Sequence, residues 1–180
     1  MHSDLIGKIE KARHYAQEPE RFALDGLTAH FHGENNEHTL TLTNNQWNCD
    51  CGAFHRHQTC AHVIALQKLL HPMLSEQARE AIPLGTSSDM ISLVEKSRHY
   101  IHEPQRVRIV RVLGRFHGSN NTHTLGFDQG AWQCDCTTFR LYQTCAHVMA
   151  LQKIMAAMLP PEALQALSPV DDQQIVGVMS

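Results

Sequence analysis

The sequence predicts an α+β fold made of two tandem homologous units. Each unit is expected to contain an N-terminal helix, a small antiparallel sheet and a ββα finger that ends in a helix. The first observation behind this is a repeat, because residues 6–74 align with residues 91–159 without a gap and 34 of the 69 aligned positions are identical. The second is that helical periodicity, β-type sequence and a second helical run follow one another in the same order in both copies.

These patterns give a division of the chain. A length of 180 residues allows two small domains, and the repeat places them. We expect a first unit, a linker, a second unit and a tail that lacks periodicity and is disordered. The expected bounds are 1–82, 83–88, 89–167 and 168–180.

The first half of each unit is expected to be a helix followed by a hairpin. Leu5, Ile9, Ala12 and Ala16 recur at helical spacing, and a Glu-Pro pair in each copy ends the helix, because proline disfavours helical geometry in the residue before it. Strands are then expected over 21–31 and 107–116, followed by Gly- and Asn-rich turns, a returning strand and a second turn. The expected turns lie at 33–36, 118–121, 44–45 and 129–130.

All six cysteines lie in two copies of one motif. The first copy reads Trp47-Asn-Cys49-Asp-Cys51, eight residues, then Cys60-Ala-His62, and the second begins 85 positions later at Trp132. Three thiols and one imidazole match a closed tetrahedral zinc site, so two zinc ions per chain are expected. The predicted ligands are Cys49, Cys51, Cys60 and His62 in the first unit and Cys134, Cys136, Cys145 and His147 in the second.

The local structure of the motif can be predicted as well. A strand would place both sulfurs of Cys-x-Cys on one face, because side chains alternate along it. The eight-residue segment is expected to be a loop that folds back. Thr59 or Thr144 is then expected to cap the finger helix. Trp47 and Trp132 are expected to pack against that helix rather than to stack on bases.

The repeat also decides which histidine is the ligand. His55 and His57 could compete with His62, but Arg140 and Tyr142 occupy their positions in the second copy. A site with four protein donors has no open coordination position, which indicates a structural role and not an enzyme. Disulfides are the alternative, and they are disfavoured because three cysteines per copy would force pairing between the copies. Without a leader-like N-terminus, we expect reduced thiols and a cytoplasmic location.

The Cys-x-Cys…Cys-x-His pattern before an apolar helix resembles the SWIM-type zinc finger. The resemblance covers both spacings in both copies, about 16 residues of each unit and the helix that follows, but not the N-terminal helix and strands. It implies a zinc-stapled ββα finger and a role in binding DNA or proteins. SWIM fingers usually accompany larger catalytic domains, such as helicases or transposases, and this chain shows none of their motifs.

Charge provides the candidate partner-binding residues. The net charge of −3 is not that of a dedicated nucleic-acid binder, yet residues 91–159 carry eight Lys and Arg against four Asp and Glu. Alternation in the second unit's strand predicts a basic face, and one arginine of its N-terminal helix could join it. These candidates are Arg106, Arg108, Arg111 and Arg115, together with Arg98.

Three functions remain open from the sequence. The first is an interaction module that binds a protein, a nucleic acid or both, with no membrane and no small-molecule substrate indicated. The second is a DNA- or RNA-binding protein that uses the basic strand of the second unit. The third is a redox sensor, in which oxidation of thiolates at a helix start expels zinc.

Overall fold

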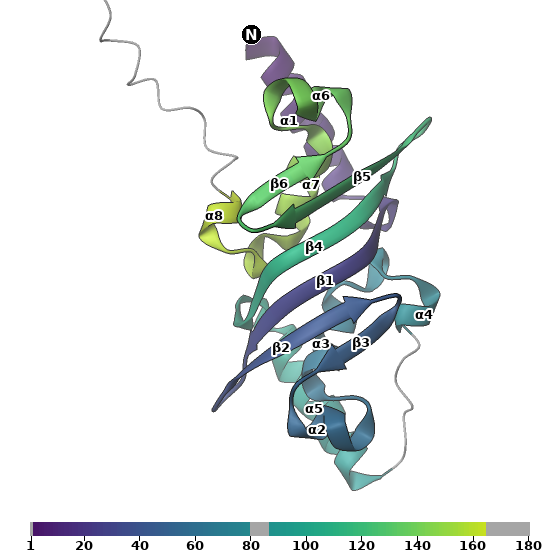
Figure 1. The fold of residues 1–180 in the computed structure, drawn as a ribbon, viewed down its shortest axis with the longest axis vertical. Coiled ribbons are helices and arrows are strands. Elements are labelled where there is room, and N and C mark those ends of the chain that lie inside the picture. Colours follow the sequence, from purple (N-terminus) through teal and green to yellow (C-terminus); the bar gives the residue numbers. More distant parts are fainter. Residues whose placement is uncertain (1, 80–86, 165–180) are drawn as a thin grey trace, which may run out of the picture.

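The two repeats share one six-stranded antiparallel sheet. The computed structural model describes residues 2–79 and 87–164, and Figure 1 shows the sheet running through the middle of the molecule. The strand order is β3-β2-β1-β4-β5-β6, so each repeat supplies three adjacent strands. The strands are β1 Phe22–His32, β2 Glu37–Thr43, β3 Gln46–Cys49, β4 Val107–His117, β5 Thr122–Asp128 and β6 Ala131–Cys134.

The first strands of the two repeats, β1 and β4, pair at the centre of the sheet. They run antiparallel, and Phe22 lies opposite Phe116 at one end while Phe31 lies opposite Val107 at the other. Phe22 and Val107 are equivalent in the repeat, as are Phe31 and Phe116, so the register obeys a pseudo-two-fold axis. The sequence left the arrangement of the two units open, and this pairing settles it.

The long helices cover one face of this sheet (Figure 1). Eight α-helices occur in the described residues, together with four short 3-10 turns, of which two lie between a helix and a strand and two between helices. Figure 1 shows the four longest helices behind the sheet, with α2 and α6 at its two ends. The helices are α1 His2–Ala16, α2 Gly52–His57, α3 Ala61–Leu69, α4 Glu76–Arg79, α5 Ser88–Ile101, α6 Thr137–Tyr142, α7 Ala146–Met155 and α8 Pro161–Leu164. The 3-10 turns are η1 Pro19–Arg21, η2 His71–Met73, η3 Pro104–Arg106 and η4 Ala156–Met158.

The N-terminal helices are exchanged between the repeats. Helix α1 packs against α7, the finger helix of the second repeat, and α5 packs against α3, the finger helix of the first. Each N-terminal helix therefore covers the finger of the other repeat. The two repeats form one interlocked body rather than two separate fingers.

The core lies between the helices and one face of the sheet. Alternate residues of β1 and β4 point into it, and Ala29, Phe31, Ile109 and Phe116 have no exposed surface. Burying such side chains contributes roughly 1.5–3 kcal/mol for each large one. The opposite residues of the strands are exposed or half-buried, so this sheet face is open to solvent.

The predicted α+β class with two repeated units, each with a three-cysteine, one-histidine cluster, is confirmed. The division into units 1–82 and 89–167 stays a prediction. Linker residues 83–86 and the tail 168–180 lie outside the described residues. No helix in the part of the chain that the structure describes is long and apolar enough to cross a bilayer.

Candidate metal centre

The first two cysteines of each motif come from the end of a strand and the start of a short helix. Cys49 is the last residue of β3, whereas Cys51 lies beyond the strand and caps α2, its Sγ accepting from the Phe54 amide at 3.4 Å. Two expectations are therefore wrong. The cysteines do not share a strand face, and the segment between the cysteine pairs is helical over Gly52–His57 rather than a loop.

The third cysteine starts the finger helix. Cys60 is the N-cap of α3, and its Sγ accepts from the Val63 amide at 3.4 Å. The predicted cap, Thr59, is instead buried, and its hydroxyl has no hydrogen-bond partner among the described residues. His62 follows in the first turn of the helix. A helix N-terminus favours negative charge, so it stabilises a thiolate at this position.

The four predicted donors meet in each repeat. Their ligand atoms lie within 4.8 Å of one another in both groups. The Cys49 and Cys134 sulfurs each lie 3.8 Å from the Nδ1 of His62 and His147 respectively. Tetrahedral zinc with ordinary bond lengths would hold sulfur and nitrogen about 3.6 Å apart, so the donor set fits this metal. The chain thus has two Cys3His sites, consistent with two zinc ions.

The thiols are buried and close together, and their pKa values reflect both facts. The hydrogen bond from Cys60 lowers the pKa of Cys49 to about 4, against the effect of burial. The hydrogen bond with Cys145 and then burial raise the pKa of Cys134 to about 12. Burial raises the pKa of Cys51 and Cys136. Three neighbouring thiols resist ionising together, and a bound dication supplies the compensating charge.

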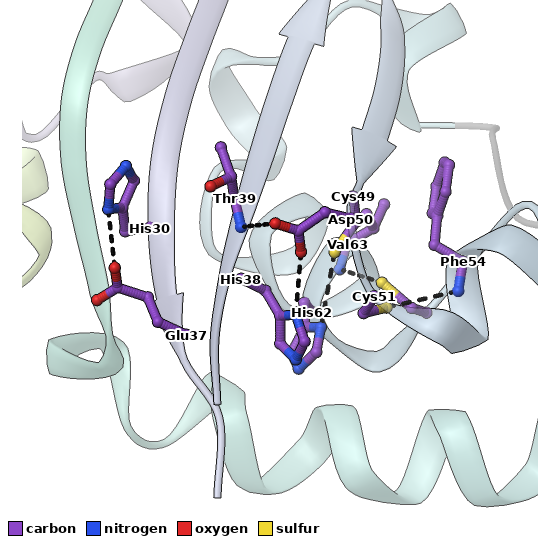
Figure 2. Close-up of polar contacts among 11 residues, drawn as sticks. His30, Glu37, His38, Thr39, Cys49, Asp50, Cys51, Phe54, His62 and Val63 are labelled. Carbon is purple, nitrogen blue, oxygen red and sulfur yellow. Dashed lines mark hydrogen bonds and ion pairs between the residues drawn. The ribbon is translucent and has the colours of Figure 1, made fainter. Parts of the chain in front are cut away.

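The ligand histidine sits in a stack of rings that the sequence did not predict. Figure 2 shows the ring of His38 beside that of His62, with centroids 4.8 Å apart. His38 Nδ1 lies 2.9 Å from Asp50 Oδ1, and the Thr39 amide donates to Asp50 Oδ2 at 3.0 Å. Asp50 is the middle residue of Cys-x-Cys. It therefore links the cysteine turn to β2.

The second repeat reproduces this arrangement. His123 Nδ1 lies 3.0 Å from Asp135 Oδ1, and the ring centroids of His123 and His147 are 4.7 Å apart. Amide donation from Thr124 is the main reason that the pKa of Asp135 is lowered. The only sign of this contact in the sequence was that the histidine and the aspartate are the same in both copies. The His–Asp contact formed in each repeat explains why they are the same.

The tryptophans were expected to pack against the finger helix, and the structure shows their indole hydrogen bonds going instead to the short helices α4 and α8. The indole Nε1 of Trp47 donates to the Ala78 carbonyl at 3.0 Å, and that of Trp132 donates to the Ala163 carbonyl at 2.9 Å. Trp47 is buried and Trp132 is half-buried. Both tie the strand that carries the first cysteine to the short helix at the end of the repeat.

Four of the five predicted basic residues are paired with carboxylates. Arg115 makes two hydrogen bonds to Asp25, at 2.7 and 2.8 Å. Arg108 lies 3.1 Å from Glu162, Arg111 lies 3.5 Å from Asp128, and Arg106 pairs with Glu103. Arg98 is exposed on α5, and Arg106 lies in η3 before β4 begins, so neither belongs to the strand that was expected to carry the basic face. The structure thus does not gather the five arginines into one uncompensated surface.

A hollow of about 610 Å³ opens on the exposed sheet face of the second repeat. It lies between β4, β5, β6 and α6, where Gly126 is paired with Leu113. In the first repeat Thr28 is paired with Thr41, so a side chain occupies the position at which Gly126 has none. Arg111, Arg140 and Gln143 also line the hollow, which the sequence did not indicate.

Comparison with known families bears on the metal sites. Residues 38–66 and residues 118–151 each match the model of the SWIM zinc finger, which confirms the resemblance in both repeats. Neither the curated proteins nor the solved structures compared with the chain gave a match. The matched segments contain the eight predicted ligands.

Proposed function

We propose, from the premise that this chain carries two SWIM zinc fingers, that it is a non-enzymatic interaction module whose partner is a protein. The observation that carries the proposal is the hollow on the exposed face of the second repeat. The metal sites stabilise the scaffold, and the open sheet presents the binding surface. Reduced, metal-bound thiols suit a cytoplasmic location.

The buried donors support a structural role for the metal. The six cysteines are between 0% and 7% exposed, and each site offers four donors. A substrate would need an open coordination position, which a complete set of four protein donors does not leave. The same burial counts against redox sensing, since an oxidant must reach a thiolate.

The charges favour a protein over a nucleic acid. Phosphate binding draws its strength from uncompensated Lys and Arg. Arg108, Arg111 and Arg115 each face a carboxylate of the same chain. Leu113, 39% exposed beside the hollow, adds the apolar contact that protein interfaces place at their centre.

The first experiment compares two matched variants in affinity capture with quantitative mass spectrometry. Leu113→Glu places a charge beside the hollow, and Thr28→Glu places the same charge at the equivalent position of the first repeat. We expect Leu113→Glu to lose the proteins that the wild type retains and Thr28→Glu to keep them. Equal loss in both variants, or in neither, contradicts the proposed surface.

The second experiment tests the nucleic-acid alternative. Random-sequence DNA and RNA are titrated with the protein across a salt series, together with a variant in which Arg106, Arg108 and Arg111 are replaced by Ala. We expect no binding near physiological salt. Binding with a steep salt dependence that the triple variant abolishes would favour the nucleic-acid function instead.

A further inference from the structure

Each ligand histidine lies against a tyrosine of the other repeat. The ring of Tyr100, in α5, stacks on the ring of His62 with centroids 5.5 Å apart and planes inclined by 20°. The ring of Tyr15, in α1, stacks on that of His147 at 5.8 Å and 17°. The exchanged helices therefore place one aromatic ring of each repeat on the metal site of the other.

A phenylalanine completes each stack. Phe31 of β1 lies 4.7 Å from both His62 and Tyr100, measured between ring centroids. Phe116 of β4 occupies the same place in the second repeat, 4.6 Å from His147 and 4.5 Å from Tyr15. The histidine has its own repeat's phenylalanine on one side and the other repeat's tyrosine on another. This packing limits the rotation of the imidazole.

Arginines fix the tyrosines to the opposite repeat. Arg106 lies 5.7 Å from the centroid of the Tyr100 ring and donates to the His32 carbonyl at 3.1 Å. Arg21 lies 5.9 Å from the Tyr15 ring and donates to the His117 carbonyl at 3.3 Å. Each arginine thus connects its own repeat's tyrosine to the end of a central strand in the other repeat.

The tyrosine acts through its ring. Tyr100 is 2% exposed, and its hydroxyl has no hydrogen-bond partner among the described residues. Removing the hydroxyl alone should therefore leave the stack intact. Removing the ring would open space beside the imidazole.

We propose that Tyr100 and Tyr15 are positioning residues that complete the metal sites across the repeat boundary, so that the two metal ions bind as a coupled pair. Tyr100 orients His62, and Tyr15 orients His147. Loss of the metal from the first site frees His62 and loosens its contact with α5, which belongs to the second repeat. The same argument applies in reverse through α1. This inference does not depend on the identity of any partner.

The test measures each site separately in the intact protein. Zinc-loaded protein is mixed with a chelator and a cysteine-alkylating reagent, and peptide mass spectrometry gives alkylation rates for the cysteines of each motif. Tyr100→Leu should speed alkylation of Cys49, Cys51 and Cys60 by about tenfold, the loss expected for a buried aromatic contact. Tyr100→Phe should retain the wild-type rate.

Two further variants make the assignment specific. Tyr15→Leu should reverse the pattern and act first on Cys134, Cys136 and Cys145. Tyr15 is only half-buried, so this variant serves if Tyr100→Leu does not fold. Tyr142→Leu is the control, because Tyr142 is 56% exposed and its ring lies against Lys8 of α1 rather than against a ligand histidine. The proposal is wrong if Tyr100→Leu mainly affects the cysteines of the second repeat, or if Tyr15→Leu mainly affects those of the first. It is also wrong if a variant does not change the alkylation rates.

The coupling has its own measurement. Zinc is added to metal-free protein in steps, and native mass spectrometry counts the bound ions. Coupled sites give mainly species with zero and two zinc ions at half-saturation. A dominant one-zinc species at that point shows independent sites and overturns the coupling.

Discussion

The two metal sites repeat the same contacts, whereas the two halves of the exposed sheet face do not. In both repeats a cysteine sulfur lies 3.8 Å from the ligand imidazole, and a His–Asp pair beside it is 2.9 or 3.0 Å long. On the exposed face, arginines at 108, 111 and 115 replace alanine, glycine and histidine of the first repeat. The metal sites are thus common to both halves, whereas the exposed side chains of the sheet differ between them.

Removal of a metal ligand is expected to have the largest effect on stability, and the effect should be the same for the two sites. Cys60→Ser and Cys145→Ser should each lose metal and several kcal/mol of stability, because structural zinc contributes on the order of 10–16 kcal/mol of binding energy. Metal analysis and urea denaturation followed by circular dichroism measure both quantities. A large loss in one variant and none in the other would mean that the two sites are not equivalent.

Substitution to alanine at one equivalent position of β2 and β5 should lower the stability of the protein by different amounts. A Cβ at Gly126 would lie 2.5 Å from the Val112 carbonyl oxygen, so Gly126→Ala should destabilise the protein by about 1–3 kcal/mol. Thr41 already carries a Cβ at the matching position, and Thr41→Ala should cost about 0.2–1 kcal/mol. Urea denaturation of both variants gives the comparison, and equal costs would contradict it.

The tryptophans allow a finer comparison of the two cores. Trp47→Phe and Trp132→Phe each remove an indole hydrogen bond worth about 0.5–1.5 kcal/mol. Trp47 is buried and Trp132 half-buried, so the first variant should also lose more packing. Thermal denaturation should rank Trp47→Phe as the less stable variant, and the opposite order would count against the difference in burial.

The smallest effect is expected for the ion pair between the repeats. Arg115 pairs with Asp25 across β4 and β1, whereas its counterpart His30 pairs with Glu37 within one repeat. An exposed pair of this kind contributes about 0.2–1 kcal/mol and weakens with salt. A double-mutant cycle with Arg115→Ala and Asp25→Ala at two salt concentrations measures it. A coupling energy that does not change with salt concentration would indicate that the two side chains interact through packing rather than through charge.

The sequence was sufficient for the metal site and insufficient for its surroundings. Two copies of one motif distinguish His62 from His55, because only the first has an equivalent histidine. Helices α2 and α6 were missed because they have six residues each and end at Gln58 and Gln143, which adopt the left-handed conformation without a glycine. The cysteine caps were missed because Thr59 is the stronger capping residue by type.

The exchange of helices had no local signal at all. The Tyr15 and His147 rings meet although they are far apart in sequence, and periodicity reports only which face of an element is apolar. The β1–β4 pairing is similar, since no hairpin turn joins those strands. Both features depend on how the apolar side chains of one repeat pack against those of the other. That packing is a property of the whole chain.

The pairing of β1 with β4 also has a consequence for ancestry. Its register places equivalent residues of the two repeats in symmetric positions, as a homodimer of a single-repeat chain would. Half of this sequence would leave one edge of β1 without a partner strand and its N-terminal helix without the finger that it covers. Such a chain could complete the sheet only with a second copy of itself. The protein therefore has the architecture of a fused dimer, in which both halves supply the scaffold equally and differ in the side chains that they expose on the open sheet face.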